Sequence, residues 1–441
     1  MPAHGDVLAQ LFVNRDTEIE QVEKAIQEVE KNKKGRALHL LGERGSGKTW
    51  LMQYLHRVKL KEITPYLKPS LYPFYIDFSF KLTSDEEDNL CVNRLPKLEL
   101  SEKKREFYFG QDEDNEQALL NLMKHIADKL DITHFSDSTL ADLSQRLRDG
   151  IERKWKKENI VIVFLLDDVY TRSESLLDLI ETHLLKPLLQ LPVLILLSGR
   201  GSPFDWISAE LRLYAKTLHL QAFDKRTMRE QIERYFQYLG LNEEDYAGIL
   251  DDYLDEIHQV SAGYPYASLY LAIQLQEGKS ISEVLDQLID CLFGFIQDPA
   301  ERKNVINHVE ALSVLNPWEI EDEISKNRWG FRINAIRRFL NAYNKCSGNY
   351  VEEIDGSEAM DIFQGLTTLR IVRWESGVGY YIDQALRFPI VARLKEKKPS
   401  LWRCLHEYAH DYFANRNEEI AEKHKAVLKK LGEKKTKPVQ P

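Results

Sequence analysis

The feature that most constrains this chain is a glycine-rich octapeptide at residues 42–49, which reads Gly-Glu-Arg-Gly-Ser-Gly-Lys-Thr. It matches the phosphate-binding pattern G-x-x-x-x-G-K-T, and it stands between an apolar run at 37–41 and a helical pattern from residue 50. Glycines let the backbone turn its N–H groups around a phosphate, and the following helix N-terminus adds a positive dipole. The alternative is a strand–turn–helix that is rich in glycine by chance, and the matching context on both sides favours the phosphate loop.

This loop predicts a bound nucleotide, ATP or ADP, together with Mg²⁺. The Lys48 ammonium is expected to reach the β- and γ-phosphates, and the Thr49 hydroxyl is expected to bind the metal. The loop residues expected to bind the nucleotide are Gly42, Gly45, Ser46, Gly47, Lys48 and Thr49. A phosphate loop alone does not make an ATPase, because hydrolysis also needs an acidic site for the metal and the attacking water.

Residues 160–168 supply two carboxylates at the end of an apolar run. Seven apolar residues, four of them β-branched, predict a central strand of a parallel sheet that is buried on both faces. Open α/β sheets bind ligands at the carboxyl ends of their strands. We assign Asp167 to Mg²⁺ through water and Asp168 to orienting or deprotonating the attacking water. The alternative is a strand that ends in a turn, since Asp favours turns.

A third apolar run, at 192–198, ends in Gly199-Arg200-Gly201. If this strand lies beside the strand of Asp167, Arg200 points at the γ-phosphate. A guanidinium fixed there stabilises charge during phosphoryl transfer and reports whether the γ-phosphate is present. The alternative is an exposed arginine on a turn.

The composition narrows the class of protein and its partners. The 441 residues suffice for two to four domains, and a net charge of −10 argues against broad binding to the nucleic-acid backbone. No apolar stretch approaches the roughly 18 residues of a membrane helix, and no signal peptide is visible. The cysteines are far apart in the sequence and indicate neither a zinc site nor a disulfide framework, so a reducing compartment, the cytoplasm, is expected. They are Cys91, Cys291, Cys346 and Cys404.

Strands and helices alternate up to about residue 223, and this order predicts an α/β fold with a doubly wound parallel sheet. Helical periodicity follows, and then helices near 300–313, 318–326 and 332–344 precede a hairpin at 369–383, which together predict a winged helix. A surface insertion is expected at 81–115. The predicted domains are an N-terminal motif and helix at 1–35, a nucleotide-binding domain at 36–223, a helical domain at 224–297, a winged helix at 298–398, a helical segment at 399–430 and a disordered tail at 431–441.

This order of parts resembles the STAND class of P-loop NTPases, which includes the NB-ARC ATPases. The segment 12–18 is similar to an apolar-Gly-Arg-x-x-Glu motif that lies near the adenine, with Asn14 in place of the glycine and Arg15 as its arginine. The Asp pair at 167–168, the arginine at 200 and Gly263-Tyr264-Pro265 match further motifs of the class. The resemblance implies that Arg15 helps to bind the nucleotide and that Pro265 packs on the adenine. The alternative, when these residues are judged alone, is a plain helix stop and restart.

The resemblance also implies a mechanism and one departure from it. Such proteins are molecular switches in which ATP is hydrolysed slowly, and the nucleotide controls assembly with a protein partner or self-assembly. The segment 381–387 lies where the class carries a Met-His-Asp-like motif, whose histidine contacts the β-phosphate of ADP. Asp383 stands at that position here and would repel a phosphate unless it is protonated or bridged, so the closed ADP state is expected to be weak.

The sequence is also compatible with two rival functions. The first is an ATP-regulated DNA-binding protein that uses the winged helix. Its support comes from Arg337, Arg338 and Lys345, which lie near the expected recognition helix. Acidic residues at 319–323 are close to them, so DNA binding is not favoured.

The second rival is a zinc metalloprotease, because residues 406–410 match H-E-x-x-H. In it, His406 and His410 would bind Zn²⁺ and Glu407 would activate water. The third ligand would come from Glu418, Glu419, Glu422 or His424. The alternative, which we favour, is a helix whose apolar side packs against the winged helix. Its apolar residues are Leu401, Leu405, Tyr408, Ala409 and Phe413.

Overall fold

The computed structural model describes residues 9–66, 69–78, 107–108, 114–133, 138–171, 173–201, 203–315, 333–348, 353–375 and 379–434. The chain divides into two compact units. The first comprises Met1–Leu254 and Gly263–Leu269, and the second comprises Asp255–Ala262 and Tyr270–Pro441. Helices α12 (Glu243–Ser261) and α13 (Pro265–Gln276) each begin in the first unit and end in the second.

The first unit is built on a six-stranded sheet with the order β3-β2-β4-β5-β1-β6. All of its neighbouring strands pair in parallel, which confirms the predicted fold class, a P-loop NTPase-type α/β sheet. Strand β5 lies between β4 and β1, so the strand that leads to Arg200 does lie beside the strand that ends at Asp167. The strands are β1 (Arg36–Gly42), β2 (Ser70–Asp77), β3 (Phe107–Tyr108), β4 (Ile160–Asp167), β5 (Val193–Gly199) and β6 (Lys216–Leu220).

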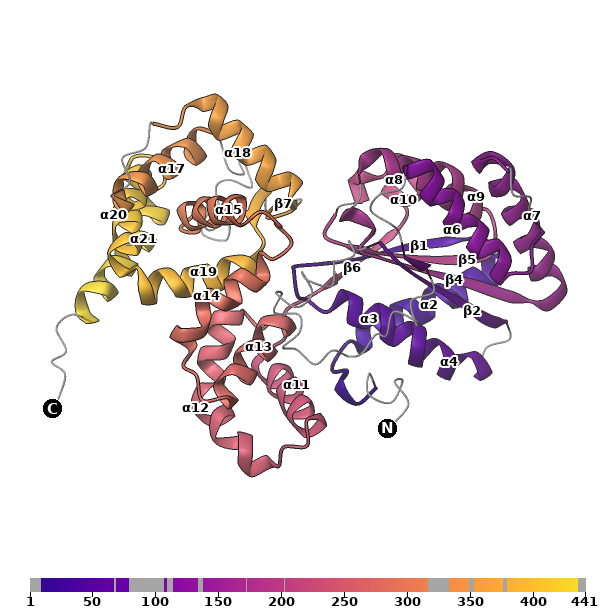
Figure 1. Ribbon diagram of the computed structural model, residues 1–441, viewed down its shortest axis with the longest axis horizontal. Coiled ribbons are helices and arrows are strands. Elements are labelled where there is room, and N and C mark those ends of the chain that lie inside the picture. The colour runs from indigo at the N-terminus through magenta and orange to yellow at the C-terminus, as the bar shows by residue number, and fades with distance from the viewer. Residues whose placement is uncertain are drawn as a thin grey trace. The chain divides into compact units, whose positions relative to one another are not determined.

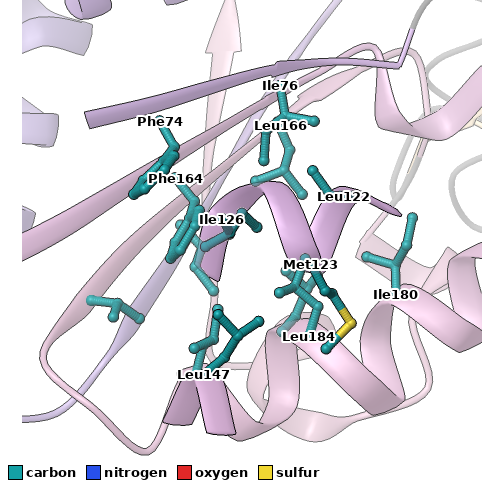
Figure 2. Close-up of a cluster of buried hydrophobic side chains, with 14 of the residues drawn as sticks. Phe74, Ile76, Leu122, Met123, Ile126, Leu147, Phe164, Leu166, Ile180 and Leu184 are labelled. Atoms are coloured by element: carbon teal, nitrogen blue, oxygen red, sulfur yellow. The ribbon is translucent and has the colours of Figure 1, made fainter. Parts of the chain in front are cut away.

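Helices cover both faces of this sheet, with α2, α3 and α4 on one face and α6 to α10 on the other (Figure 1). Each face therefore has its own apolar core, and alternate residues of β4 enter opposite cores. Phe164 and Leu166 join the cluster drawn in Figure 2, whereas Val163 and Leu165 join the cluster on the other face. Burial on both faces explains why β4 is apolar from Ile160 to Leu166, as the sequence predicted.

The helices of the first unit follow the amphipathic patterns of the sequence. Helix α7, for example, begins at a capping box in which the Thr139 hydroxyl accepts a hydrogen bond from the backbone N–H of Asp142. The helices are α2 (Asp16–Asn32), α3 (Lys48–Tyr54), α4 (Leu60–Ile63), α6 (Asn115–Lys129), α7 (Leu140–Glu158), α8 (Glu174–Ile180), α9 (Lys186–Leu188), α10 (Ala209–Arg212) and α11 (Lys225–Tyr238), and a short 3₁₀ turn, η5 (Val169–Thr171), follows β4.

In its described residues the second unit is helical apart from two antiparallel strands, β7 (Val372–Glu375) and β8 (Gly379–Ile382), whose pairing confirms the predicted hairpin. The sequence did not predict α18, whose N-cap is Asp355. The helix expected near 318–326 lies outside the described residues, so the winged helix stays a prediction. The helices are α14 (Ile281–Leu292), α15 (Pro299–Leu312), α17 (Ile333–Ser347), α18 (Gly356–Thr368), α19 (Gln384–Lys397), α20 (Pro399–Ala414) and α21 (Glu418–Lys434).

Two predicted boundaries change. Within the expected insertion at 81–115, residues 107–108 form β3 and pair with β2, while most of the segment lies outside the described residues. Helix α21 extends to Lys434, past the predicted start of the tail at 431, because the Lys-rich sequence still favours a helix there.

The expectation that no disulfide forms is wrong for Cys346 and Cys404. These residues form a disulfide with Cα atoms 5.9 Å apart, which joins α17 to α20. They are 58 residues apart in the sequence, and only the packing of α17 on α20 brings them together. Disulfides are typical of oxidising compartments, so cysteine usage no longer supports the cytoplasm. Within the described ranges, no helix is both long and apolar enough to cross a membrane.

Candidate functional site

The phosphate loop connects β1 to α3, as the sequence predicted. Gly45 and Gly47 adopt positive φ angles of 71° and 92°, a conformation that glycine adopts without the steric cost of a Cβ. The Lys48 Nζ atom donates hydrogen bonds to the carbonyl oxygens of Gly42, at 3.0 Å, and Glu43, at 2.9 Å. The ammonium group is thereby held over the loop, while the neighbouring Thr49 at the start of α3 is exposed.

Asp167 ends β4 as a buried carboxylate with two hydrogen-bond donors. The Tyr75 hydroxyl donates to Oδ2 at 2.8 Å, and the Ser198 hydroxyl donates to Oδ1. Burial raises the pKa of Asp167 to about 6, and the neighbouring Asp77 carboxylate, aligned with it across β2 and β4, contributes to this rise. The two hydroxyl donors act in the opposite direction. The charged form is therefore costly here unless a cation is close, which suits a carboxylate that faces Mg²⁺.

Asp168 follows directly and turns the chain away from the sheet. Its φ of 54° lies in the left-handed region, which Asp tolerates better than most residues, and its backbone N–H donates to the Ser198 hydroxyl at 3.4 Å. The side chain is partly exposed, in contrast to that of Asp167. The two carboxylates therefore differ in environment, which is consistent with different roles for them.

The end of β5 lies between the phosphate loop and the two aspartates. Leu197 is aligned with Leu166 of β4, and Gly199 is aligned with Leu41 of β1, so Arg200 emerges at the same edge as both. Its side chain is partly buried. The strand that leads to Arg200 thus lies beside the strand of Asp167, as the prediction for Arg200 requires. The contact of Arg200 with a γ-phosphate stays a prediction.

Arg15 ties the N-terminal motif to the phosphate loop. Its Nη2 atom donates to the carbonyl oxygens of Ser46, at 2.9 Å, and Gln221, at 3.0 Å, and its guanidinium lies 4.5 Å from the centre of the Phe223 ring. Burial lowers the pKa of Arg15. Asn14 has a φ of 40°, a conformation that asparagine tolerates. This explains how it replaces the glycine of the related motif. A direct contact of Arg15 with the nucleotide stays a prediction.

The segment 263–266 also lies against the loop. The backbone N–H of Tyr266 donates to the carbonyl oxygen of Gly45 at 3.2 Å, and a Cβ on Gly47 would lie 4.0 Å from Cγ of Pro265. Pro265 and the phosphate loop are distant in the sequence, but they are neighbours within the first unit. Contact of Pro265 with an adenine stays a prediction.

Sequence reasoning missed the side chains that support the site. Tyr75 and Ser198 hold Asp167, and Tyr170 with His39 lies beneath the end of β5. None belongs to a recognisable motif. Ser198 lies in β5, two residues before Arg200, and this position is the one signal that pointed to it.

Asp383 is fully buried in the second unit, where its carboxylate caps α19 by accepting a hydrogen bond from the Ala385 N–H at 3.1 Å. A helix cap explains an aspartate at this position without any nucleotide. Replacement by histidine would remove this cap, so that variant is a poor probe of ADP affinity. A role of Asp383 toward ADP stays a prediction.

The zinc alternative finds no support. Among the described residues, no group of three or more His, Cys, Asp or Glu side chains could hold a metal ion. The His406 ring is buried, with its Nδ1 atom 2.8 Å from Nδ1 of His424, and both rings pack among aromatic side chains. Glu407 forms an ion pair with Arg403 instead of facing this site. The sequence pattern belongs to a helix that packs through its apolar side.

Two of the three basic residues expected near a recognition helix make contacts within α17 or with α20. Arg337 donates to the side chain of Asn334 at 3.2 Å, and the Arg338 guanidinium lies 5.7 Å from the centre of the Tyr412 ring. Neither observation favours a DNA-binding face.

A comparison with known protein families finds no match, and a comparison with curated proteins finds none. Among solved structures, a Walker-type ATPase of Pyrococcus abyssi matches with 16% identity and a TM-score of 0.46, covering 86% of this chain and 96% of that chain. The ORC2 protein of Aeropyrum pernix, in ADPNP–ADP complexes, matches with 12% identity and a TM-score of 0.44, covering 86% and 95%. The RuvB Holliday junction branch migration motor of Thermotoga maritima matches with 11% identity and a TM-score of 0.34, covering 84% and 92%. At these identities and TM-scores the matches assign no family, and the fold rests on the strand order and the loop.

Proposed function

We propose that this chain is an ATP-binding molecular switch that hydrolyses ATP slowly with Mg²⁺ and signals its nucleotide state to a protein partner or through self-assembly. The observation that carries the proposal is the meeting of three sites at one edge of the sheet. The phosphate loop follows β1, Arg200 follows β5, and the two aspartates end β4, and these three strands are adjacent. This is where open α/β sheets bind their ligands.

The residues at this edge fit a magnesium nucleotide. The positive φ angles of Gly45 and Gly47 shape a loop whose N–H groups can surround phosphates, and Lys48 adds a cation on a flexible side chain. Asp167 is a buried carboxylate whose hydrogen-bond donors from β2 and β5 are neutral hydroxyls, so its charge would gain from a nearby cation. When bound, Mg²⁺ would neutralise phosphate charge, with Thr49 and Asp167 as the residues that hold it.

The chain's own residues divide the work of hydrolysis. Lys48 binds the β- and γ-phosphates and withdraws charge from them. Asp168, more exposed than Asp167, orients the attacking water and accepts its proton. Arg200 stabilises the charge that develops on the γ-phosphate. Hydrolysis needs all three, whereas binding needs chiefly the loop and Lys48.

The resemblance to STAND proteins supports the switch, and so does the position of α13. This helix begins at Pro265 beside the phosphate loop, where Tyr266 bonds to Gly45, and its residues from 270 onward belong to the second unit. A phosphate that moves the loop therefore acts on a helix shared by both units. A ligand shifts the equilibrium between two conformations only if it makes different contacts in each of them.

The experiment that tests the switch compares the protein with ADP and with a non-hydrolysable ATP analogue. Small-angle scattering should report a change in compactness, or a sizing column a change in mass, between the two states. Lys48→Ala should abolish that difference, because it removes the cation that reaches the phosphates. Superimposable scattering curves and equal masses in both states would show that the chain does not switch by itself.

A further inference from the structure

Arg200 is flanked by two glycines, and a single aromatic ring lies against both of them. A Cβ on Gly199 would lie 2.7 Å from Cδ2 of Tyr170, and a Cβ on Gly201 would lie 2.0 Å from Cδ1 of the same ring. Real Cβ atoms do not approach so closely. The backbone on either side of Arg200 is therefore folded directly onto the Tyr170 ring, and glycine is required at 201 because this ring occupies the space.

The hydroxyl of Tyr170 is fixed at the centre of a buried hydrogen-bond network. It lies 2.5 Å from Nδ1 of His39, and the indole N–H of Trp206 donates to it at 2.9 Å. The other His39 nitrogen, Nε2, lies 2.7 Å from the carbonyl oxygen of Leu211.

The chemistry of these groups fixes every donor. A carbonyl only accepts, so His39 Nε2 carries the proton and donates to Leu211, and burial, which lowers the pKa of His39, keeps the ring neutral. Nδ1 is then a lone pair, which accepts from the Tyr170 hydroxyl. That hydroxyl oxygen in turn accepts from Trp206. Each of these polar atoms is satisfied, and such networks hold their members rigidly.

We propose that Tyr170 is the positioning residue for Arg200. Its hydroxyl is anchored to His39 of β1, the strand that leads into the phosphate loop, and its ring supports the backbone at Gly199 and Gly201. Tyr170 thus adds a side-chain link between β1 and the backbone around Arg200 to the direct pairing of β1 with β5. This inference rests on the proposed function, because Arg200 must sense the γ-phosphate for its position to matter.

A ring used only as filler would need no hydroxyl. Leucine or phenylalanine would fill the same apolar space, but would leave His39 Nδ1 and the Trp206 N–H buried without their partner. The hydrogen bonds of the hydroxyl therefore fix the position of the Tyr170 ring, and the ring in turn fixes the backbone at Gly199 and Gly201. Removal of the Tyr170 side chain should make the position of Arg200 less well defined, and it should leave unchanged the loop residues that bind the β-phosphate.

The test is a double-mutant cycle on nucleotide preference, measured by calorimetry with Mg²⁺. The preference is the affinity for a non-hydrolysable ATP analogue divided by the affinity for ADP. Arg200→Ala should lower this preference about tenfold, because a charged hydrogen bond to the γ-phosphate is lost. Tyr170→Leu should lower it by a similar factor, and the double variant should be no worse than Arg200→Ala alone.

Several results would overturn the inference. If Tyr170→Leu weakens both nucleotides equally and keeps the wild-type preference, its role is only structural. The same holds if the two losses multiply in the double variant. If Arg200→Ala keeps the preference, no sensor exists to be positioned, while ATP binding still stands. If the wild-type protein binds neither nucleotide, the proposed function fails as well.

A second variant covers the case in which Tyr170→Leu does not fold. Gly201→Ala keeps the whole network but places a methyl group where the Tyr170 ring lies, so the Arg200 backbone must shift. It should lower the preference as Arg200→Ala does. The matched control is Gly248→Ala on α12, whose added Cβ would meet nothing within 4 Å. Wild-type preference in Gly201→Ala, with an unchanged melting temperature, would overturn the inference.

Discussion

Asp167 should stabilise the protein less than an asparagine at the same position when no nucleotide is bound. Burial and the neighbouring Asp77 carboxylate raise its pKa from 3.8 to about 6 in the folded chain. A carboxylate with a raised pKa contributes stability below its unfolded pKa and loses it as the pH rises from about 4 to about 6. At pH 7.5 the folded protein therefore carries the full cost of an ionised, buried Asp167.

The size of this cost follows from the two pKa values. The difference between 3.8 and about 6, at about 1.4 kcal/mol for each pKa unit, corresponds to about 3 kcal/mol. The asparagine side chain would keep one acceptor oxygen and would weaken one of the two hydrogen bonds from Tyr75 and Ser198, at a cost of about 1 kcal/mol. Asp167→Asn should thus stabilise the nucleotide-free protein by about 2 kcal/mol at pH 7.5.

Scanning calorimetry without nucleotide tests this prediction. The transition of the first unit should rise by about 4–8 °C in Asp167→Asn at pH 7.5. At pH 4 the gain should vanish, because Asp167 is then protonated in the wild-type protein. Asp178→Asn, at an exposed position of α8, is the matched control and should change little. A variant that melts below the wild type at pH 7.5, or a gain that persists at pH 4, would refute the reasoning.

Three further outcomes are expected. Asp168→Asn should spare ATP binding but suppress hydrolysis, since it removes a base and keeps the shape; a wild-type rate of phosphate release would show that the role is wrong. Burial lowers the pKa of His406 to about 3 and that of His424 to about 4, from their ordinary value of 6.5. The two neutral histidines are therefore compatible with the folded state above pH 6.5, and the free energy of unfolding should fall as the pH drops from 6.5 toward 4. At pH 5 the loss should be about 2 kcal/mol for each histidine, measured in urea; a flat profile in the second unit between pH 7 and 5 contradicts it. Reducing Cys346–Cys404, which are 58 residues apart, should destabilise the second unit by about 4 kcal/mol, seen as an earlier denaturation midpoint with dithiothreitol; an unchanged midpoint argues against the bond.

The fold and the centre of the site were predictable because they rest on local patterns. The glycine loop at 42–49 and the apolar strand before Asp167 are each a short run of consecutive residues, and their chemistry is tied to a fixed spacing. Parallel order then places Arg200 beside them. A pattern of this kind can be recognised in a single sequence, because the residues that form it are consecutive.

The supporting side chains could not be predicted, because contacts between distant segments bring them together. Tyr170 reaches His39 across 131 positions, and nothing in either neighbourhood marks the pair. The disulfide between Cys346 and Cys404 likewise depends on how α17 packs on α20. The H-E-x-x-H pattern at 406–410 shows the reverse case, in which a local pattern with the right spacing belongs to no group of three metal ligands in the described part of the chain.

The central claim is that the loop at 42–49 binds a magnesium nucleotide, and titration calorimetry tests it most directly. We expect the wild-type protein to bind ATP or ADP with Mg²⁺ at low-micromolar affinity or tighter, about −8 kcal/mol. Lys48→Ala should weaken binding at least tenfold, or about 1.4 kcal/mol, because it removes the cation that reaches the phosphates. The matched control, Lys24→Ala on the exposed face of α2, should bind as the wild type does. Equal affinity of Lys48→Ala and the wild type would contradict the account.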